Sequence, residues 1–392
     1  MLKRSISDAD VAGKRVLVRV DFNVPMQNGV ITDDTRIHAA LPTIRDLLDR
    51  GAAVILATHL GRPKGKPDPK YSVAPIAARL SELLDRRVET VSSVAGPDAE
   101  SAAKQLESGQ ILLLENTRFE PGEETNDPAL AAAFARLADI FVNDAFGAAH
   151  RTHASTVGVA GLLPSYAGLL LQREEAMLSR LLDNPERPFV AILGGAKVSD
   201  KLGVLAHLLR RVDALLLGGG MANTVLLARG HDIGSSLAEP DRVPDARSLV
   251  DKARERGVEL LLPTDVVVAR GLDAEAGAAV SVDEIPRDQS VFDIGPETIK
   301  RFCDQIGKAK TIFWNGPMGV FEQPAFAEGT MAVARCVAAA RAFTVVGGGD
   351  SVAAIEASGI ADAIGHISTG GGASLEFLEG RTLPGIAALP DA

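Results

Sequence analysis

Apolar segments of mostly four to six residues recur along the chain, and each ends abruptly at glycine or at charged residues before a helical pattern begins. The segments are rich in Val, Ile and Leu and do not alternate with polar residues, which is typical of strands buried on both faces of a sheet. These predicted strands lie at residues 15–20, 54–58, 111–114, 140–142, 189–193, 214–217, 259–262, 311–314 and 343–346.

Helical patterns fill the stretches between these strands, for example at residues 35–50, 73–84, 128–138 and 200–211. A strand, a helix and a second strand at this spacing predict right-handed crossovers and parallel sheets. For a chain of 392 residues, two sheets fit the length better than one. We therefore predict an α/β protein with two doubly wound, Rossmann-like domains. Each is a parallel sheet flanked by helices, and the two face each other across a cleft.

The predicted boundary between the domains lies near Leu170, where an apolar segment leads into a charged helical pattern at residues 173–182. This gives an N-terminal domain of residues 1–170 and a C-terminal domain of residues 171–379. The charged helix either crosses between the domains or lies on the surface of one of them, and the sequence does not decide between the two.

Composition narrows the possible classes of function. The formal net charge is −10, which argues against general nucleic-acid binding because that needs a basic surface. Residues 1–8 lack the apolar region of a secretory signal, and no stretch reaches the roughly 18 uninterrupted apolar residues of a membrane span. Cys303 and Cys336 are too few for a disulfide framework, so we expect two reduced thiols in a core. These features predict a cytoplasmic protein that binds neither nucleic acid nor membrane.

Polar and basic residues follow the predicted strands of the first half. Ligands of open parallel sheets bind beyond the carboxyl ends of the strands, so these residues are expected to converge. They include Arg36, Arg62, Arg118 and Arg151, together with His59. A guanidinium group pairs well with carboxylate and phosphate oxygens. One such arginine is more often a solvated surface charge, but four at equivalent strand ends of an acidic protein indicate a site for a multiply charged anion.

His150 and His153 have an H-x-x-H spacing, which raises the question of a metal site. The surrounding loop offers no third ligand nearby in the sequence, and zinc sites use at least three protein ligands. We therefore expect both histidines to bind an anion or to form hydrogen bonds within the loop.

Glycine-rich turns follow the predicted strands of the second half instead. Glycine lets backbone N–H groups approach a ligand, and the N-terminus of a following helix favours anions. Any one glycine triplet can be merely a tight connection, but several at one end of a sheet indicate a platform for a nucleotide. The turns lie at residues 194–197, 218–221, 315–319, 347–351 and 370–373.

Neither of two common phosphate-binding motifs is present. The P-loop spacing is absent, and Asn223, Val352 and Leu375 stand where G-x-G-x-x-G needs its third glycine. The sequence therefore predicts neither a Walker ATPase nor an NAD enzyme, but a kinase-like protein of another design.

Three charged residues of the second half are suited to phosphates. Lys197 and Lys201 lie one helical turn apart at the predicted opening of a helix, where phosphate oxygens would separate the two cations. Asp350 follows a glycine triplet, and a lone carboxylate beside nucleotide phosphates is a common ligand of Mg²⁺. The same carboxylate can also cap the helix that begins near Ser351.

Taken together, these motifs resemble those of the phosphoglycerate kinase family over essentially the whole chain. The matching segments are residues 19–25, 59–63, 114–119, 143–147, 194–201, 314–322, 347–351 and 368–374. The resemblance implies reversible phosphoryl transfer in glycolysis, from ATP to the carboxylate of 3-phosphoglycerate, giving ADP and 1,3-bisphosphoglycerate, with Mg²⁺ on the nucleotide. It also implies a monomer whose C-terminal tail, residues 380–392, packs back on the N-terminal domain.

The resemblance assigns the two substrates to different domains. The acid is assigned to Asp21, Phe22, Asn23, Arg36, His59, Leu60, Gly61, Arg62, Arg118 and Arg151. The nucleotide is assigned to Gly194, Gly195, Lys197, Lys201, Gly219, Asn315, Pro317, Glu322, Gly348, Gly349, Asp350 and Ser351, with Glu322 near the ribose and Asp350 positioning the metal. Catalysis is assigned to Arg36, Lys197, Gly371 and Gly372. Two departures from the family pattern, Asn223 for a frequent Phe and Ser351 for a frequent Thr, leave the expected reaction intact.

The expected mechanism needs no general base, because the accepting carboxylate is already ionised near neutral pH. Catalysis would consist of alignment and charge neutralisation of the phosphoryl group after the domains close. Two alternatives compete with it: a kinase for another small carboxylic acid, and a two-lobed anion-binding protein without activity. The first does not need so many arginines, and the second leaves Lys197, Lys201 and Asp350 unexplained.

Overall fold

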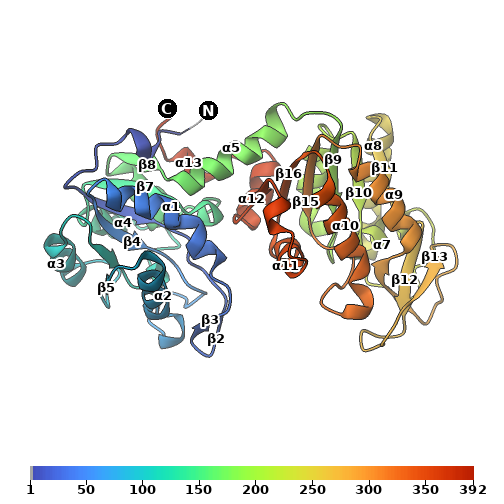
Figure 1. Ribbon diagram of the computed structural model, residues 1–392, viewed down its shortest axis with the longest axis horizontal. Helices are drawn as coiled ribbons and strands as arrows, with labels where there is room; N and C mark the ends of the chain where they lie inside the picture. Colours follow the sequence, from blue (N-terminus) through green and yellow to red (C-terminus); the bar gives the residue numbers. More distant parts are fainter. Residues whose placement is uncertain (1–2) are drawn as a thin grey trace. The chain divides into compact units, whose positions relative to one another are not determined.

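The computed structural model describes residues 3–392. The chain divides into two compact units (Figure 1). The N-terminal unit contains the residues up to Ala176 together with Thr382–Ala392, and the C-terminal unit is Met177–Arg381. The division falls within helix α5 (Leu169–Asp183), so this charged helix contributes to both units. The sequence analysis placed the boundary at residue 170, close to the start of this helix.

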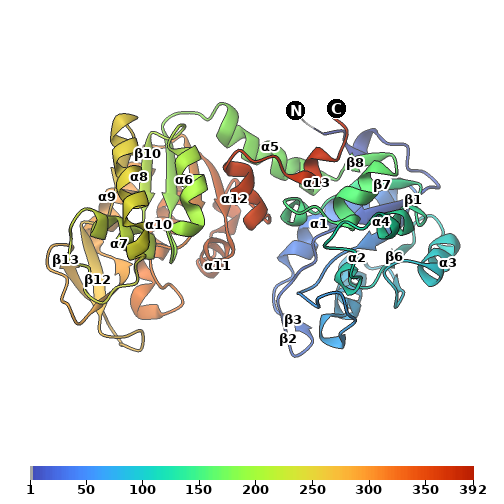
Figure 2. The ribbon, with the colours of Figure 1, turned by 180° about the vertical axis from the view of Figure 1, so that it is seen from behind.

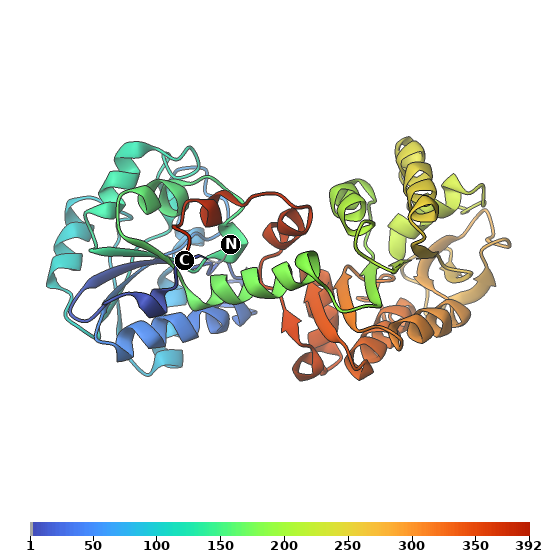
Figure 3. The ribbon, with the colours of Figure 1, turned by 90° about the horizontal axis from the view of Figure 1, so that it is seen from above.

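The N-terminal unit is built on a six-stranded parallel sheet with the strand order β5-β6-β4-β1-β7-β8. The strands are β1 (Arg15–Arg19), β4 (Ala53–Ala57), β5 (Val88–Thr90), β6 (Ile111–Leu113), β7 (Ile140–Asn143) and β8 (Ser165–Ala167). The helices are α1 (Thr35–Asp49), α2 (Ala74–Leu84), α3 (Pro97–Gln105) and α4 (Pro128–Ala135). Figure 3 shows α1 and α2 (blue) on one side of this sheet and α3 and α4 (teal to green) on the other.

Both faces of this sheet are buried, as the continuous apolar segments predict. Val18 and Leu56 belong to one hydrophobic cluster with Ile44 of α1 and Leu80 of α2. Their sequence neighbours point to the opposite face, because side chains alternate along a strand. Leu17 is one of these neighbours, and it is also fully buried.

The C-terminal unit repeats this plan with a second six-stranded parallel sheet, in the order β11-β10-β9-β15-β16-β17. Its strands are β9 (Phe189–Leu193), β10 (Ala214–Leu217), β11 (Glu259–Leu261), β15 (Thr311–Asn315), β16 (Phe343–Gly347) and β17 (His366–Ile367). Its helices are α6 (Leu202–Leu208), α7 (Gly219–Ala228), α8 (Val243–Glu255), α9 (Pro296–Ile306), α10 (Glu328–Ala339), α11 (Gly349–Ala357) and α12 (Gly372–Leu378). The fold class predicted from the sequence, two parallel sheets flanked by helices, is confirmed.

Two small antiparallel sheets were not predicted. One is a hairpin of β2 (Met26–Gln27) and β3 (Val30–Ile31). The other is formed by β12 (Asp265–Ala269), β13 (Ala278–Ser281) and β14 (Ser290–Ile294). The hairpin, β13 and much of β14 are exposed or partly exposed, so their sequences lack the continuous apolar character that marks the central strands.

The C-terminal tail belongs to the N-terminal unit. Helix α13 (Pro384–Ala387) lies there in Figure 2. The backbone N–H of Gly385 donates to the carbonyl of Ala149 at 2.8 Å, and the side chain of Asn143 donates to the carbonyl of Gly385 at 3.0 Å. Nζ of Lys3 lies 2.7 Å from the carboxylate of Asp391. The last residues therefore return to the sheet near β7.

Cys303 in α9 and Cys336 in α10 form a disulfide, with their Cα atoms 5.5 Å apart. The expectation of two reduced thiols is therefore wrong. Residues of α9 and α10 share one hydrophobic cluster on the same side of the sheet, and the spacing of two cysteines in a sequence does not reveal which helices are neighbours. As for membranes, none of the helices within residues 3–392 is both long enough and apolar enough to span a bilayer.

Candidate active site

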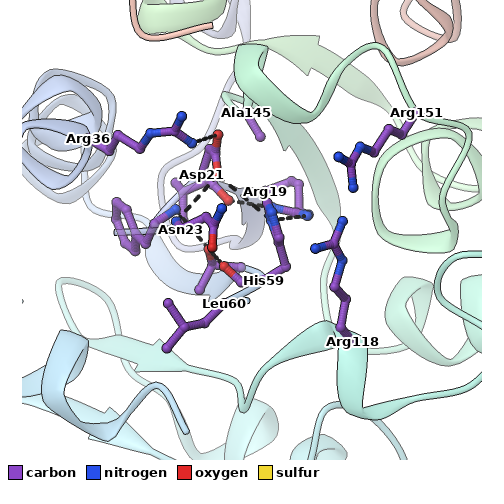
Figure 4. Close-up of polar contacts among 12 residues, drawn as sticks. Arg19, Asp21, Asn23, Arg36, His59, Leu60, Arg118, Ala145 and Arg151 are labelled. Carbon is purple, nitrogen blue, oxygen red and sulfur yellow. Dashed lines mark hydrogen bonds and ion pairs between the residues drawn. The ribbon is translucent and has the colours of Figure 1, made fainter. Parts of the chain in front are cut away.

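Charged side chains gather at the carboxyl ends of the N-terminal strands (Figure 4). The buried carboxylate of Asp21 accepts a hydrogen bond from Nη1 of Arg36 at 2.5 Å, and its second oxygen lies 3.7 Å from Nδ1 of His59. The side-chain oxygen of Asn23 accepts a hydrogen bond from the N–H of Gly61 at 2.9 Å. These contacts connect the segments that follow β1 and β4, which the topology predicted to converge.

Arg19, at the end of β1, lies at the centre of this site and was missed by the sequence analysis. It is fully buried, and its Nε donates to the hydroxyl of Ser155 at 2.7 Å. Nη1 donates to the carbonyl of Val20 at 2.5 Å, and Nη2 lies 3.2 Å from Nδ1 of His59. The signal that could have revealed it is an arginine inside an apolar strand, because a buried charge needs partners.

Two further arginines complete what we call the basic cluster: Arg19, Arg36, Arg118, Arg151 and His59. Nη1 of Arg118 donates to the carbonyl of Gly61 at 2.7 Å, so this arginine is held by the loop after β4. Burial, and after it the charge of Arg151, lowers the pKa of Arg118 to about 10. Nε of Arg151 lies 3.1 Å from Nε2 of His150.

His59 and His153 are held neutral. Burial, followed by the charges of the four arginines of the basic cluster, lowers the pKa of His59 well below its usual value. The pKa of His153 falls to about 3, again through burial first and the charges of nearby arginines second. The basic cluster therefore carries its positive charge on guanidinium groups, and the region resists a further proton. An anion is the partner that such a potential favours.

The other residues assigned to the acid have different places. Phe22 and Leu60 are buried, and their backbones are fixed by side chains from neighbouring segments, Thr58 for Phe22 and Asn116 for Leu60. Arg62 is exposed to solvent. Residues 3–392 contain no group of three His, Cys, Asp or Glu placed to hold a metal ion, either at His150 and His153 or among their neighbours.

Asn116 and Tyr71 shape the loop after β4, and the sequence analysis assigned neither to the site. Asn116 is fully buried; its side chain accepts from the N–H of Leu60 at 3.2 Å and donates to the carbonyls of Leu60 and Tyr71 at 2.7 and 2.9 Å. The ring of Tyr71 packs on Gly61, where a Cβ atom would overlap it. Asn116 therefore fixes the backbone of Leu60, and Tyr71 packs on Gly61, whose N–H and carbonyl are bonded to Asn23 and Arg118.

In the C-terminal unit, glycines allow the turns after the strands to pack against one another. A Cβ atom on Gly194 would overlap the carbonyl oxygen of Pro317, and the N–H of Gly195 donates to that same carbonyl at 3.1 Å. Gly219, with φ of +63°, packs on the backbone of Gly195 and opens helix α7. The turns after β9, β10 and β15 therefore form one continuous backbone surface.

Several polar side chains assigned to the nucleotide support this surface. Nζ of Lys201 donates to the carbonyls of Gly194 and Asn315 at 2.7 and 2.9 Å, and burial lowers its pKa to about 8. The hydroxyl of the buried Ser351 accepts from the N–H of Gly316 at 2.5 Å. Lys197 is exposed and precedes a 3₁₀ turn (Ser199–Lys201) and α6, so the prediction that the two lysines open one α-helix is wrong.

Two hollows lie along this surface, and both include Gly195, Ala196 and Asp350. The first is a cavity of about 530 Å³ with apolar walls such as Leu237, Val291 and Met318; it also contains Gly219, Pro317 and Glu322. The second, of about 350 Å³, is lined by Lys197, Lys201, Gly194, Asn315, Gly348, Gly349, Ser351, Gly371 and Gly372. All the residues assigned to the nucleotide therefore line one of two adjoining hollows. One is mainly apolar, as suits a base, and one is polar and cationic, as suits phosphates.

Comparisons with known proteins point to one family. The model of the phosphoglycerate kinase family matches residues 6–381. The phosphoglycerate kinases of Roseiflexus castenholzii and Chloroflexus aurantiacus are 60% and 59% identical to this chain, and each alignment covers all of both chains. The solved phosphoglycerate kinase structures from Coxiella burnetii and Pyrococcus horikoshii match with TM-scores of 0.89 and 0.88 at 45% and 37% identity, covering 98% of each chain.

The chain belongs to the phosphoglycerate kinase family. It is accordingly a phosphotransferase, and its reaction is that of the family: reversible phosphoryl transfer between ATP and the carboxylate of 3-phosphoglycerate, a step of glycolysis. The resemblance stated from the sequence motifs is confirmed.

One departure from the usual family sequence lies in the first hollow. Asn223 is buried in α7, and its side chain donates to the carbonyl of Leu237 at 3.1 Å. Both residues line the cavity of about 530 Å³. The amide therefore holds a segment of the cavity wall.

The second hollow suits a phosphate-bound Mg²⁺ ion. Asp350, at the start of α11, is exposed and lines both hollows. A single carboxylate fits an ion that keeps several waters and takes its other ligands from nucleotide phosphates. Asp350 is thus the residue that would hold the ion.

Proposed function

We propose that the N-terminal unit binds 3-phosphoglycerate through the basic cluster and that the C-terminal unit binds the nucleotide in the two hollows. The observation that carries this assignment is the basic cluster, in which burial and the charges of four arginines lower the pKa of His59. A phosphate and a carboxylate on one small molecule supply the charge that such a cluster lacks. The glycine-rich surface supplies backbone N–H groups and Lys197, which suit the polyphosphate of a nucleotide.

The proposed chemistry requires no general base. The attacking carboxylate is ionised near neutral pH, and the enzyme has to align it with the γ-phosphoryl group and neutralise charge on the equatorial oxygens. We assign this neutralisation to Arg36 and Lys197, supported by backbone N–H groups of Gly371 and Gly372 at the start of α12. Mg²⁺ held at Asp350 would neutralise charge on the nucleotide phosphates.

Transfer requires that the donor and acceptor atoms meet, so we propose that the two units close over their substrates and exclude water. We further propose that the protein is a monomer and acts in the cytoplasm, where glycolysis takes place. The absence of a bilayer-spanning helix within residues 3–392 is compatible with that location.

A coupled assay of ATP consumption tests the substrate assignment. The protein is incubated with ATP, Mg²⁺ and 3-phosphoglycerate, with acetate and glycerate as matched acids that lack the phosphate. We expect turnover with 3-phosphoglycerate and none above background with the other two. Equal turnover with glycerate would show that the arginines do not recognise the phosphate group of 3-phosphoglycerate. No turnover by folded protein that binds ADP would overturn the assignment of the acid site.

A further inference from the structure

A buried carboxylate beneath the basic cluster has no part in the mechanism so far. Glu123 lies in the turn between Phe119 and α4, and its side chain is fully buried. Its carboxylate accepts two hydrogen bonds from Ser155, at 3.0 Å from the backbone N–H and at 2.5 Å from the hydroxyl. It also lies 4.0 Å from Nη2 of Arg19 and 3.7 Å from Nδ1 of His153. A buried charge of this kind needs a reason, because desolvation is costly.

The hydroxyl of Ser155 joins Glu123 to the basic cluster. It donates its proton to Glu123 and accepts a hydrogen bond from Nε of Arg19 at 2.7 Å. A hydroxyl has one proton to donate and lone pairs to accept, so both bonds can exist together. Nη2 of Arg19 in turn lies 3.2 Å from His59. The contacts therefore form a chain of four residues, Glu123, Ser155, Arg19 and His59.

The charge of Glu123 also supports the guanidinium groups. Burial lowers the pKa of Arg19, and Glu123 is the largest of the influences that raise it again. Glu123 also acts to raise the pKa of Arg118, although burial keeps that value low. The other buried carboxylate here, Asp21, is bonded to Arg36 on another side of the cluster. Glu123 is thus the counter-charge for the buried side of the basic cluster.

We propose that Glu123 is a positioning residue of the acid site, which acts through Ser155 on Arg19 and His59 and does not itself touch substrate. This inference rests on the proposed binding of 3-phosphoglycerate at the basic cluster. The backbone carbonyl of Glu123 also accepts a hydrogen bond from the N–H of Ala154 at 3.0 Å. Glu123 therefore fixes the start of the segment 154–158, which follows Arg151. Losing the carboxylate would leave Arg19 without its nearest counter-charge and free to turn away from His59.

Positioning and simple electrostatics make opposite predictions for Glu123→Gln. If Glu123 acted only as a negative charge near the site, its removal would strengthen the attraction for an anion and lower the KM for 3-phosphoglycerate. If it positions Arg19, the KM for 3-phosphoglycerate rises by at least about tenfold, while the KM for ATP stays within about twofold. A lowered or unchanged KM for the acid, or equal rises in both KM values, would overturn the proposal.

Ser155→Ala breaks the same chain and keeps both charges, so it provides a second variant. We expect the KM for 3-phosphoglycerate to rise by about threefold or more. The KM of the double variant should be no higher than that of Glu123→Gln, because the effects of two substitutions in one chain of contacts are not additive. Additive effects would contradict the chain of contacts. If Glu123→Gln does not fold, Ser155→Ala decides, and an unchanged KM for the acid then overturns the proposal.

The matched control is Glu175→Gln, which removes a buried carboxylate from α5 in the same unit. Its KM for 3-phosphoglycerate should equal that of the wild type. A rise equal to that of Glu123→Gln would overturn the assignment of Glu123 to the chain of four residues. Wild-type turnover is measured in the same series. A wild type that does not use 3-phosphoglycerate would refute the proposed acid site itself, whereas a wild type that does leaves the variants to test Glu123 alone.

Discussion

The two units share an architecture and differ in what stands at the carboxyl ends of their strands. In the N-terminal unit, charged side chains such as Arg19 and Asp21 are buried. Arg19 contacts His59, and Asp21 is bonded to Arg36. In the C-terminal unit, glycines such as Gly194 and Gly219 bring bare backbone together, and the charged side chains of Lys197 and Asp350 are exposed. The same fold therefore offers two ways to bind anions, one through guanidinium groups and one through backbone N–H groups.

This difference predicts where each unit is sensitive. A site made of buried charges depends on electrostatic balance, because removal of one partner leaves the other uncompensated. A site made of glycine turns depends on close packing, because an added methyl group has nowhere to go. The variants below test this contrast, beginning with the largest expected effect.

Arg36→Ala should lower kcat by about 10²–10³-fold, by analogy with the loss of one donor from an oxyanion site. Arg36 is partly exposed, so its removal opens no cavity in the core, but it leaves the buried carboxylate of Asp21 without this partner. The measurement is steady-state kinetics, with kcat and both KM values taken from the same preparation. Arg36→Lys is the matched variant and should recover part of kcat, since it restores the charge without the planar fork. An unchanged kcat in Arg36→Ala would exclude Arg36 from the transfer step.

Gly194→Ala should weaken ADP binding by about a hundredfold, or about 3 kcal/mol. The new Cβ atom would overlap the carbonyl oxygen of Pro317, and two backbone segments must separate to admit it. Calorimetric titration with ADP measures the effect. Gly161→Ala is the control, because a Cβ atom there meets nothing within 4 Å. Wild-type affinity in Gly194→Ala would show that the packed turns do not form the nucleotide site.

Replacing both Cys303 and Cys336 by Ser should lower the stability of the C-terminal unit by about 2–3 kcal/mol. The disulfide joins residues 33 apart in the sequence, and opening a loop of this size increases the entropy of the unfolded chain. Trp314, the single tryptophan of the chain, is buried in this unit and reports its unfolding by fluorescence. Tyr71 and Tyr166, the two tyrosines, lie in the N-terminal unit and provide the internal control.

Reduction of the wild-type protein should have the same effect as the double substitution. A wild type whose tryptophan transition does not move under reducing conditions would argue that the bond is not formed in solution. Alkylation and mass spectrometry of protein taken from cells would show directly whether the thiols are free there. Because cytoplasmic proteins are generally kept reduced, this result also bears on the proposed location.

The sequence predicted the sheets because strands buried on both faces are continuous apolar segments, which can be recognised in the sequence alone. It also placed Asp21, His59 and Arg118 near one another, since the carboxyl ends of parallel strands lie at one edge of a sheet. It missed Arg19, which stands inside an apolar segment and was counted as a strand residue. It missed Glu123 as well, because a glutamate in a turn has no sequence mark that distinguishes a buried position from an exposed one.

Contacts between distant segments account for the other failures. The disulfide depends on α9 and α10 being neighbours in the fold. The hydrogen bonds of Lys201 depend on the carbonyls at two strand ends, Asn315 and Gly194, which lie 114 and seven residues away in the sequence. Local patterns carry no information on such pairs. The sites are therefore predictable in their residue types and in the end of the sheet they occupy, and unpredictable in the hydrogen bonds that hold them.

The smallest expected effect concerns pH. In the folded N-terminal unit the pKa of His153 is lowered to about 3, against an unfolded value near 6.5. The unfolded chain therefore binds a proton that the folded chain excludes, so stability should be lost as the pH falls from about 6.5 towards 3. The buried Asp144 works in the opposite direction, because burial raises its pKa to about 6 and the folded state takes up a proton there first.

A comparison of wild type with His153→Asn separates these two effects. Asn can still cap the short helix that His153 begins, so the substitution chiefly removes the titrating group. Between pH 7.5 and pH 5 the wild type should lose up to about 2 kcal/mol more unfolding free energy than the variant, measured by urea titration with tyrosine signals. Parallel pH profiles would mean that burial and the charges around His153 do not lower its pKa. In that case the stability of the N-terminal unit would not depend on the balance of its buried charges, and the proposed contrast with the C-terminal unit would fail.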